Sequence, residues 1–209
     1  HNPYARLPFA ISAKQYTNSA MIAAPINLMD ASPTGDGAAA ALIVPFESVR
    51  GDKQAVQIAG SGAATDTISV HSRKTPLFLQ AAYLSVERAY AQAGVAPDDI
   101  DFFELHDAFS IMTALSLEAC GFAEKGQGPR LGLDDEIKIK GGRIPICTRG
   151  GLKARGHPVG ATGMYQIVES VQQLRGECGE TQVDGAKIGM AQNIGGSGAS
   201  ILTHILKIA

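Results

Sequence analysis

The chain has 209 residues, of which 45% are hydrophobic and 18% charged, so it can bury a sizeable core and is not a disordered protein. Its formal net charge is −2 and it has no basic block, which argues against nucleic acid or an anionic membrane as its main partner. No apolar run reaches transmembrane length. The three cysteines lack C-x-x-C spacing, so neither a disulfide framework nor a metal site is expected, and the composition favours a cytoplasmic protein.

The first half of the chain begins with an irregular stretch. Residues 11–21 predict a short helix, and residues 36–44 are small and then branched aliphatic residues, which suit a buried strand or a tightly packed helix end. Residues 53–61 predict a strand. Residues 75–93 predict a helix, because apolar residues recur at helical spacing between an early proline and Gly94.

The second half alternates strands and helices. The predicted elements are a strand at 98–105, a helix at 108–119, a polar surface excursion at 122–143, a strand at 144–146, a helix at 162–174, and strands at 186–192 and 199–208. This alternation predicts an α/β domain with a mainly parallel sheet and helices on both faces. The last two strands have no helix between them, so we expect them to be antiparallel.

Three polar motifs follow predicted strands: His106 with Asp107, residues 150–163, and residues 193–198. Because ligands bind at the carboxyl ends of strands in such sheets, we expect these motifs to converge. Residues 150–163 contain five glycines and a single histidine, His157. Glycine permits close backbone approaches, so this turn suits an imidazole that is presented to a ligand. The alternative is a tight strand-to-helix connection whose histidine only hydrogen-bonds its own loop.

Five stretches together form a more specific pattern than any one of them: residues 2–5 (NPYA), 32–40 (SPTGDGAAA), 104–109 (ELHDAF), 150–163 and 193–196 (NIGG). In their order and spacing, the chain resembles the C-terminal half of a thiolase, in the branch of archaeal acetoacetyl-CoA thiolases and sterol-carrier-protein-type thiolases. The resemblance implies a βαβαβαββ domain with a mixed five-stranded sheet covered by helices. It also implies that residues 1–50 end the N-terminal domain and that residues 51–209 form the C-terminal domain.

The resemblance implies an acyl-CoA C-acyltransferase of the acetyl-CoA acetyltransferase type, active in lipid metabolism. Thiolases form or cleave a carbon–carbon bond between acyl groups through an acyl-cysteine, and the nucleophilic cysteine lies in the N-terminal half, outside this chain. The expected substrates are coenzyme A thioesters, with no permanently bound cofactor. The expected assembly is a homodimer or homotetramer, which in this branch can also associate with a small zinc-ribbon and OB-fold protein.

The resemblance also assigns roles to individual residues. His157 matches the histidine that activates the nucleophile and donates to the enolate oxygen, which suits a group with a near-neutral pKa. His106 stands where most thiolases have asparagine and would help form the same oxyanion hole. The alternative for His106 is a strand-end histidine bonded to Asp107 or to the backbone. Gly195 matches the glycine whose backbone N–H completes a second oxyanion hole.

One departure from the family concerns proton transfer at the α-carbon. Thiolases use a second cysteine there, at the position of Asn193 or of Ala108, and neither residue is cysteine here. Cys147 is the candidate substitute, and its alternative is a buried small hydrophobic residue. The departure leaves two other functions open: a thiolase-like aldolase acting on a 3-hydroxyacyl-CoA, against which the retained His157 argues, and a non-catalytic, partner-binding protein.

Overall fold

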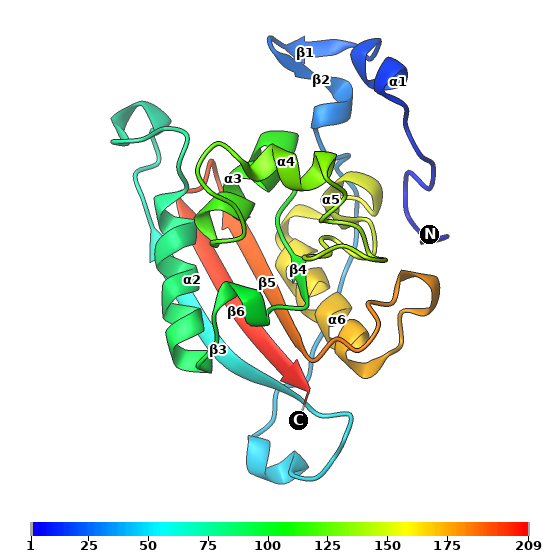
Figure 1. Ribbon diagram of the computed structural model, residues 1–209, viewed down its shortest axis with the longest axis vertical. Helices are drawn as coiled ribbons and strands as arrows, with labels where there is room; N and C mark the ends of the chain where they lie inside the picture. The colour runs from blue at the N-terminus through cyan, green and yellow to red at the C-terminus, as the bar shows by residue number, and fades with distance from the viewer. Residues whose placement is uncertain (1, 209) are drawn as a thin grey trace.

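The computed structural model describes residues 2–208 (Figure 1). Within them, the main sheet has four strands in the order β3–β6–β5–β4. Their bounds are Val56–Thr65 for β3, Phe102–Glu104 for β4, Ile188–Gly195 for β5 and Ser200–Ile208 for β6. The last strand, β6, lies between β3 and β5 and is antiparallel to both, whereas β4 is parallel to β5.

Two expectations about the sheet are corrected. The sheet is mixed, as the resemblance implies, and not mainly parallel, as the alternation of elements alone predicts, because the chain returns at the end through β6 into the middle of the sheet. The expected strand at residues 144–146 is reduced to a single parallel bridge between Phe103 and Ile146, so the fifth strand of the implied sheet is present only as that bridge. The antiparallel pairing of the last two strands is confirmed.

The helices cover both faces of the sheet (Figure 1). Those of the domain are α2 Gln80–Ala93, α3 Ser110–Ala119, α4 Gly128–Leu133, α5 Gly151–Ala154 and α6 Thr162–Arg175. Helix α2 packs against β3 and β6, and α6 packs mainly against β5. Single 3-10 turns occur at Leu28–Asp30, Phe46–Val49, Val70–Ser72, Pro97–Asp99, Val159–Ala161 and Gly179–Thr181.

Strand β3 extends beyond the predicted residue 61, because it pairs with β6 as far as Thr65, which lies opposite Ser200. At Gly60 and Gly62, a Cβ atom would collide with the backbone carbonyls of Ala89 and Ser85 in α2. Small residues are therefore required on this face of the strand, although their composition alone is typical of a loop. Helix α2 begins at Gln80 and not at residue 75, because residues 76–79 form a turn before it.

The core lies on both faces of the sheet. Phe103, Met190 and Ile205 are fully buried on one face, and Phe102 with Leu206 are buried on the other. Each large apolar side chain removed from water in this way stabilises the fold by about 1.5–3 kcal/mol. The sheet is thus held between two apolar layers, which fixes the ends of β4 and β5.

The first fifty residues contain helix α1 (Ala13–Thr17) and the hairpin β1–β2 (Met21–Ala23, Ile26–Asn27), set apart from the sheet in Figure 1. The helix expected within 11–21 is present but short. The expectation for 36–44 is wrong: the segment forms no strand or helix, and Leu42 is 90% exposed. Its aliphatic residues have no covering layer within residues 2–208. The domain boundary at residue 50 stays a prediction.

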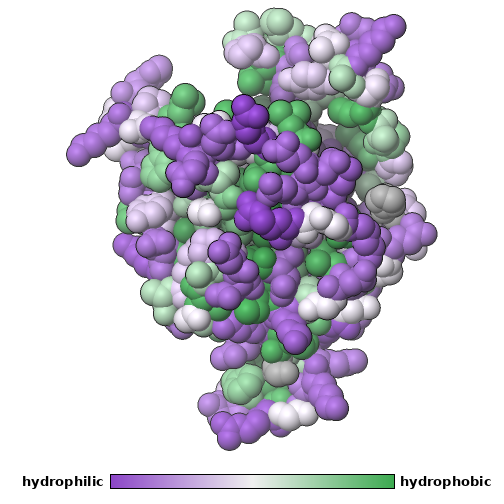
Figure 2. All heavy atoms as spheres, in the orientation of Figure 1, coloured by the Kyte–Doolittle hydropathy of each residue, from purple (hydrophilic) through white to green (hydrophobic). Residues whose placement is uncertain are grey.

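Polar residues cover much of the face seen in Figure 2, with hydrophobic residues scattered among them. In the part of the chain that the structure describes, no helix is long and apolar enough to cross a membrane.

Candidate active site

The three polar motifs meet at the carboxyl ends of β4 and β5, as the sequence predicts. Asn193 Nδ2 lies 3.1 Å from His106 Nδ1. The rings of His106 and His157 stand edge to face, with centroids 5.1 Å apart and an interplanar angle of 87°. Because β4 and β5 are parallel and paired, their ends deliver His106 and Asn193 to one point, and the glycine-rich turn adds His157.

His157 is held by its backbone and by its ring. Its N–H donates to Pro33 O at 2.9 Å, and Gly35 N–H donates to His157 O at 3.2 Å. The ring Nδ1 lies 2.7 Å from the hydroxyl oxygen of Thr162, which is fully buried. The segment at 33–35 and the start of α6 therefore fix the imidazole on two sides.

Asp107 fixes the turn that carries His157. Its buried carboxylate accepts the backbone N–H groups of Leu152 at 2.7 Å and Lys153 at 3.2 Å, the first amides of α5. Gly151 has φ of +55° and lies so close that a Cβ atom would be 2.5 Å from an Asp107 oxygen. Burial raises the pKa of Asp107, and these N–H donors oppose that shift.

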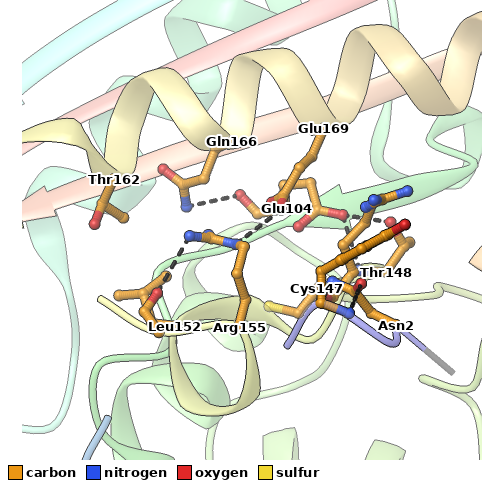
Figure 3. A network of polar contacts seen from close by, with 12 residues as sticks. Asn2, Glu104, Cys147, Thr148, Leu152, Arg155, Thr162, Gln166 and Glu169 are labelled. Atoms are coloured by element: carbon orange, nitrogen blue, oxygen red, sulfur yellow. Dashed lines mark hydrogen bonds and ion pairs between the residues drawn. The ribbon is translucent and has the colours of Figure 1, made fainter. Parts of the chain in front are cut away.

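A second buried network joins β4, the glycine-rich turn and α6 (Figure 3). Glu104 accepts hydrogen bonds from Thr148 N–H at 2.8 Å and from the Thr148 hydroxyl at 2.7 Å. Arg155 forms a buried ion pair with Glu169 at 2.8 Å. Burial, followed by the charge of Glu104, raises the pKa of Glu169, and the Arg155 charge opposes that shift. Breaking one partner of such a pair would leave a buried charge uncompensated.

Burial lowers the pKa of both histidines, which favours their neutral forms. Burial, with the nearby His157 and Arg155, lowers the pKa of His106 to about 4. Burial also lowers the pKa of His157, which is half-buried, while the Asp107 charge opposes that change. A neutral imidazole has one accepting and one donating nitrogen, so each ring can serve as a base or as a hydrogen-bond donor.

The low pKa of His106 has a consequence for stability. Between pH 6.5 and about 4, the histidine at position 106 binds a proton in the unfolded chain but not in the folded protein. The free energy of unfolding therefore decreases by up to about 3 kcal/mol as the pH is lowered through this range. In His106→Asn, we expect a shallower fall over this window, measured by urea unfolding at several pH values. His71→Asn, at an exposed histidine, is the control and should follow the wild type. Parallel curves for all three proteins would contradict the account.

Gly195 lies exposed at the end of β5, two residues after Asn193. Its φ is outside the left-handed region, and a Cβ atom there would be 3.4 Å from Ser200 O, an ordinary contact. No contact within residues 2–208 requires glycine at this position. If glycine is required there, the reason would be contact with a bound molecule or with another segment. The oxyanion role of Gly195 stays a prediction.

Cys147 lies in the turn before Gly150, and its thiol donates to Leu105 O at 3.6 Å. It packs against the main apolar cluster. Burial raises its pKa well above the usual range, and the charges of Asp107 and Glu104 add to this shift. These surroundings favour the alternative of a buried small residue, and the role of proton carrier stays a prediction.

A serine at position 147 tests that role. Its hydroxyl can donate to Leu105 O as the thiol does, so the turn should be preserved. We expect Cys147→Ser to keep thiolase turnover within about threefold of the wild type, because a half-buried thiol with a raised pKa is a poor proton carrier. A much larger loss of kcat, with an unchanged urea midpoint, would instead assign Cys147 to proton transfer.

The sequence interpretation missed the residues that orient the two histidines. Thr162 contacts His157, and Gln166 contacts Asn193 at 3.0 Å. The signal in the sequence is a row of polar residues at helical spacing on α6, on the side of the helix that faces the core. Its members, all buried, are Thr162, Gln166, Glu169, Ser170 and Gln173. Buried polar groups need partners, so a polar stripe on a core-facing helix indicates a hydrogen-bonded site.

Comparisons with known proteins identify the relatives of this chain. The family model described as "Thiolase C-terminal domain-like" matches residues 62–208. Acetyl-CoA acetyltransferase of Methanothermobacter thermautotrophicus is 44% identical over 98% of this chain and 54% of that protein. Sterol carrier protein 2 of Rattus norvegicus is 36% identical over 97% of this chain and 38% of that protein.

A solved structure named "Ltp2-ChsH2(DUF35) aldolase" shares the fold, with a TM-score of 0.83 at 24% identity, over 95% of this chain and 51% of that chain. The chain thus spans about half the length of the first of these curated relatives, or less. The family match covers most of the chain and includes both histidines and Asn193. The chain therefore belongs to the thiolase family, in the branch with archaeal acetyl-CoA acetyltransferases and sterol carrier protein 2.

Proposed function

We propose that this chain supplies the C-terminal half of the active site of an acyl-CoA C-acyltransferase of the acetyl-CoA acetyltransferase type. The observation that carries the proposal is the pair of imidazoles, His106 and His157, which stand edge to face beside the ends of β4 and β5. Burial favours the neutral form of both rings. The nucleophilic cysteine and most of the acyl pocket would come from an N-terminal half. The substrates would be coenzyme A thioesters.

His157 is suited to two successive roles. Its ring nitrogen Nδ1 faces a hydroxyl, and a hydroxyl can accept or donate a hydrogen bond. With its proton on Nδ1, the ring has a free Nε2 that can take the proton of a thiol, and the Nε2–H of the resulting imidazolium can then bind an enolate oxygen. If the imidazolium then gives up its Nδ1 proton, Thr162 becomes the donor to Nδ1 and Nε2–H remains. The Thr162 contact therefore permits both states without moving the ring.

The missing second cysteine leaves one alternative reaction open. Neither Ala108 nor Asn193 can exchange a proton at the α-carbon. In a retro-aldol cleavage of a 3-hydroxyacyl-CoA, a neutral imidazole would take the 3-hydroxyl proton, the bond between C2 and C3 would break, and the imidazolium would return the proton to C2 of the enolate, without an acyl-cysteine. An aldolase is therefore the second candidate function.

From the resemblance of this chain to its thiolase branch, we also propose that the full-length protein forms a homodimer or homotetramer and associates with a zinc-ribbon and OB-fold protein.

One assay separates the two reactions. Full-length protein containing this chain is incubated with acetoacetyl-CoA and coenzyme A, and separately with a 3-hydroxyacyl-CoA. Acetyl-CoA formed in the first mixture supports the thiolase. An aldehyde or ketone released only in the second mixture supports the aldolase, and no product in either would reject both enzymatic proposals.

A further inference from the structure

The contacts of Gln166 fix the orientation of its side-chain amide. Its nitrogen Nε2 lies 3.1 Å from the carbonyl oxygen of Glu104 and 2.8 Å from that of Gln192. A carbonyl oxygen can only accept, so both hydrogens of the Gln166 amide are used by these two strands. Gln166 is 1% exposed, which leaves its oxygen Oε1 for a partner within the site.

That partner is Asn193. Its nitrogen Nδ2 lies 3.0 Å from Gln166 Oε1 and 3.1 Å from His106 Nδ1. Because Oε1 accepts one hydrogen of the amide, the second hydrogen points to the ring, and the reverse orientation would place two acceptors face to face. A Cβ atom on Gly163 would lie 3.3 Å from Asn193 Cγ, so α6 also confines the amide.

We propose that Gln166 and Asn193 are positioning residues that lock His106 in the tautomer with its proton on Nε2. Nδ1 receives a hydrogen from Asn193 and so carries no proton, which leaves Nε2–H as the only donor of the ring. The two histidines then differ: an amide fixes His106 in one state, whereas a hydroxyl lets His157 exchange its proton. The tautomer follows from the contacts alone, and its catalytic use rests on the proposed function.

The catalytic consequence is a permanent hydrogen-bond donor beside the base. An oxyanion is stabilised by a preorganised N–H donor, and a lone pair at the same place would repel it. Asn193 would thus stand at the position of the family's second cysteine with a different role, because it orients a donor and exchanges no proton. Loss of one such donor lowers kcat by about 10²-fold.

The tautomer is measured by two-bond nitrogen–proton correlation spectra of full-length protein with ¹⁵N-labelled histidine. Comparison with His106→Asn identifies the His106 signals. We expect protonated Nε2 and unprotonated Nδ1 in the wild type. In Asn193→Ala the preference should be lost, and in Asn193→Asp the carboxylate should draw the proton to Nδ1. The control Asn18→Asp makes the same change at an exposed asparagine and should leave the spectrum unchanged.

Protonated Nδ1 in the wild type would overturn the proposal, as would an unchanged His106 signal in both Asn193 variants. Steady-state kinetics on the same proteins provide a second readout. Both variants should lower kcat about 10²-fold with a smaller change in KM, and Asn18→Asp should not. The proposed function and the proposed tautomer can be tested separately. An inactive wild-type protein with the expected tautomer would reject the enzymatic function, but it would support the fixed tautomer of His106.

Discussion

Replacing His157 by alanine is expected to lower kcat for acetoacetyl-CoA cleavage by at least about 10²–10⁴-fold. The reason is that, under the proposed function, its imidazole, with a pKa lowered by burial, would be the base that takes the proton of the nucleophilic thiol. With acetyl-CoA as the acyl donor, stopped-flow detection of the released coenzyme A measures the acylation step directly, and that step should slow by a similar factor.

The control is His71→Ala, which removes an imidazole from an exposed 3-10 turn. It should retain wild-type turnover. The urea midpoint of His157→Ala reports whether the turn still folds, because His157 also bonds through its backbone to the segment at 33–35. A folded His157→Ala protein with near-normal acylation would remove His157 from the mechanism.

Replacing Gly151 by alanine is expected to destabilise the protein by about 2–4 kcal/mol, from the combined cost of a left-handed alanine and of overpacking. Gly151 has φ of +55°, and an added Cβ atom would lie 2.5 Å and 2.6 Å from the two carboxylate oxygens of Asp107. To relieve this clash, Asp107 would have to release the amides that begin α5. The urea midpoint and the kcat should therefore fall together.

Gly179 provides a matched control, because its φ is +56° and an added Cβ atom would meet nothing within 4 Å. Gly179→Ala has the backbone strain without the collision. Its destabilisation should be limited to about 1–2 kcal/mol, and its kcat should be unchanged. Equal destabilisation by the two variants would show that Asp107 is not a constraint on the glycine-rich turn.

The fold was predictable where hydrophobic periodicity acts alone. Helix α6 was predicted to within one residue at its end, and the β5–β6 hairpin was predicted with its antiparallel pairing. Hydrophobic periodicity gave the wrong prediction where the structure of a segment depends on the elements packed against it. The aliphatic residues at 36–44 are typical of a buried segment, but burial depends on a covering layer. Helix α4 occupies the expected surface excursion, because Gly128 allows it to dock against the Ala114 carbonyl of α3.

The candidate site was predictable only in part, for a related reason. The ends of strands and the glycine-rich turn indicate His106 and His157, because these features depend on local sequence. The residues that orient them are remote in sequence. Gln166 is 27 positions from Asn193, and Asn193 is 87 positions from His106. A relay of amides becomes visible only when the sheet and α6 are assembled.

Under the proposed function, this chain is half of an enzyme that works through an acyl-cysteine. The most direct test is the denatured intact mass of the natively expressed, full-length protein before and after incubation with acetyl-CoA. We predict a gain of one acetyl group, located by peptide mapping on a cysteine other than Cys120, Cys147 and Cys178, and a loss of that gain in His157→Ala. An unchanged mass, or an acetyl group on one of these three cysteines, would contradict the account.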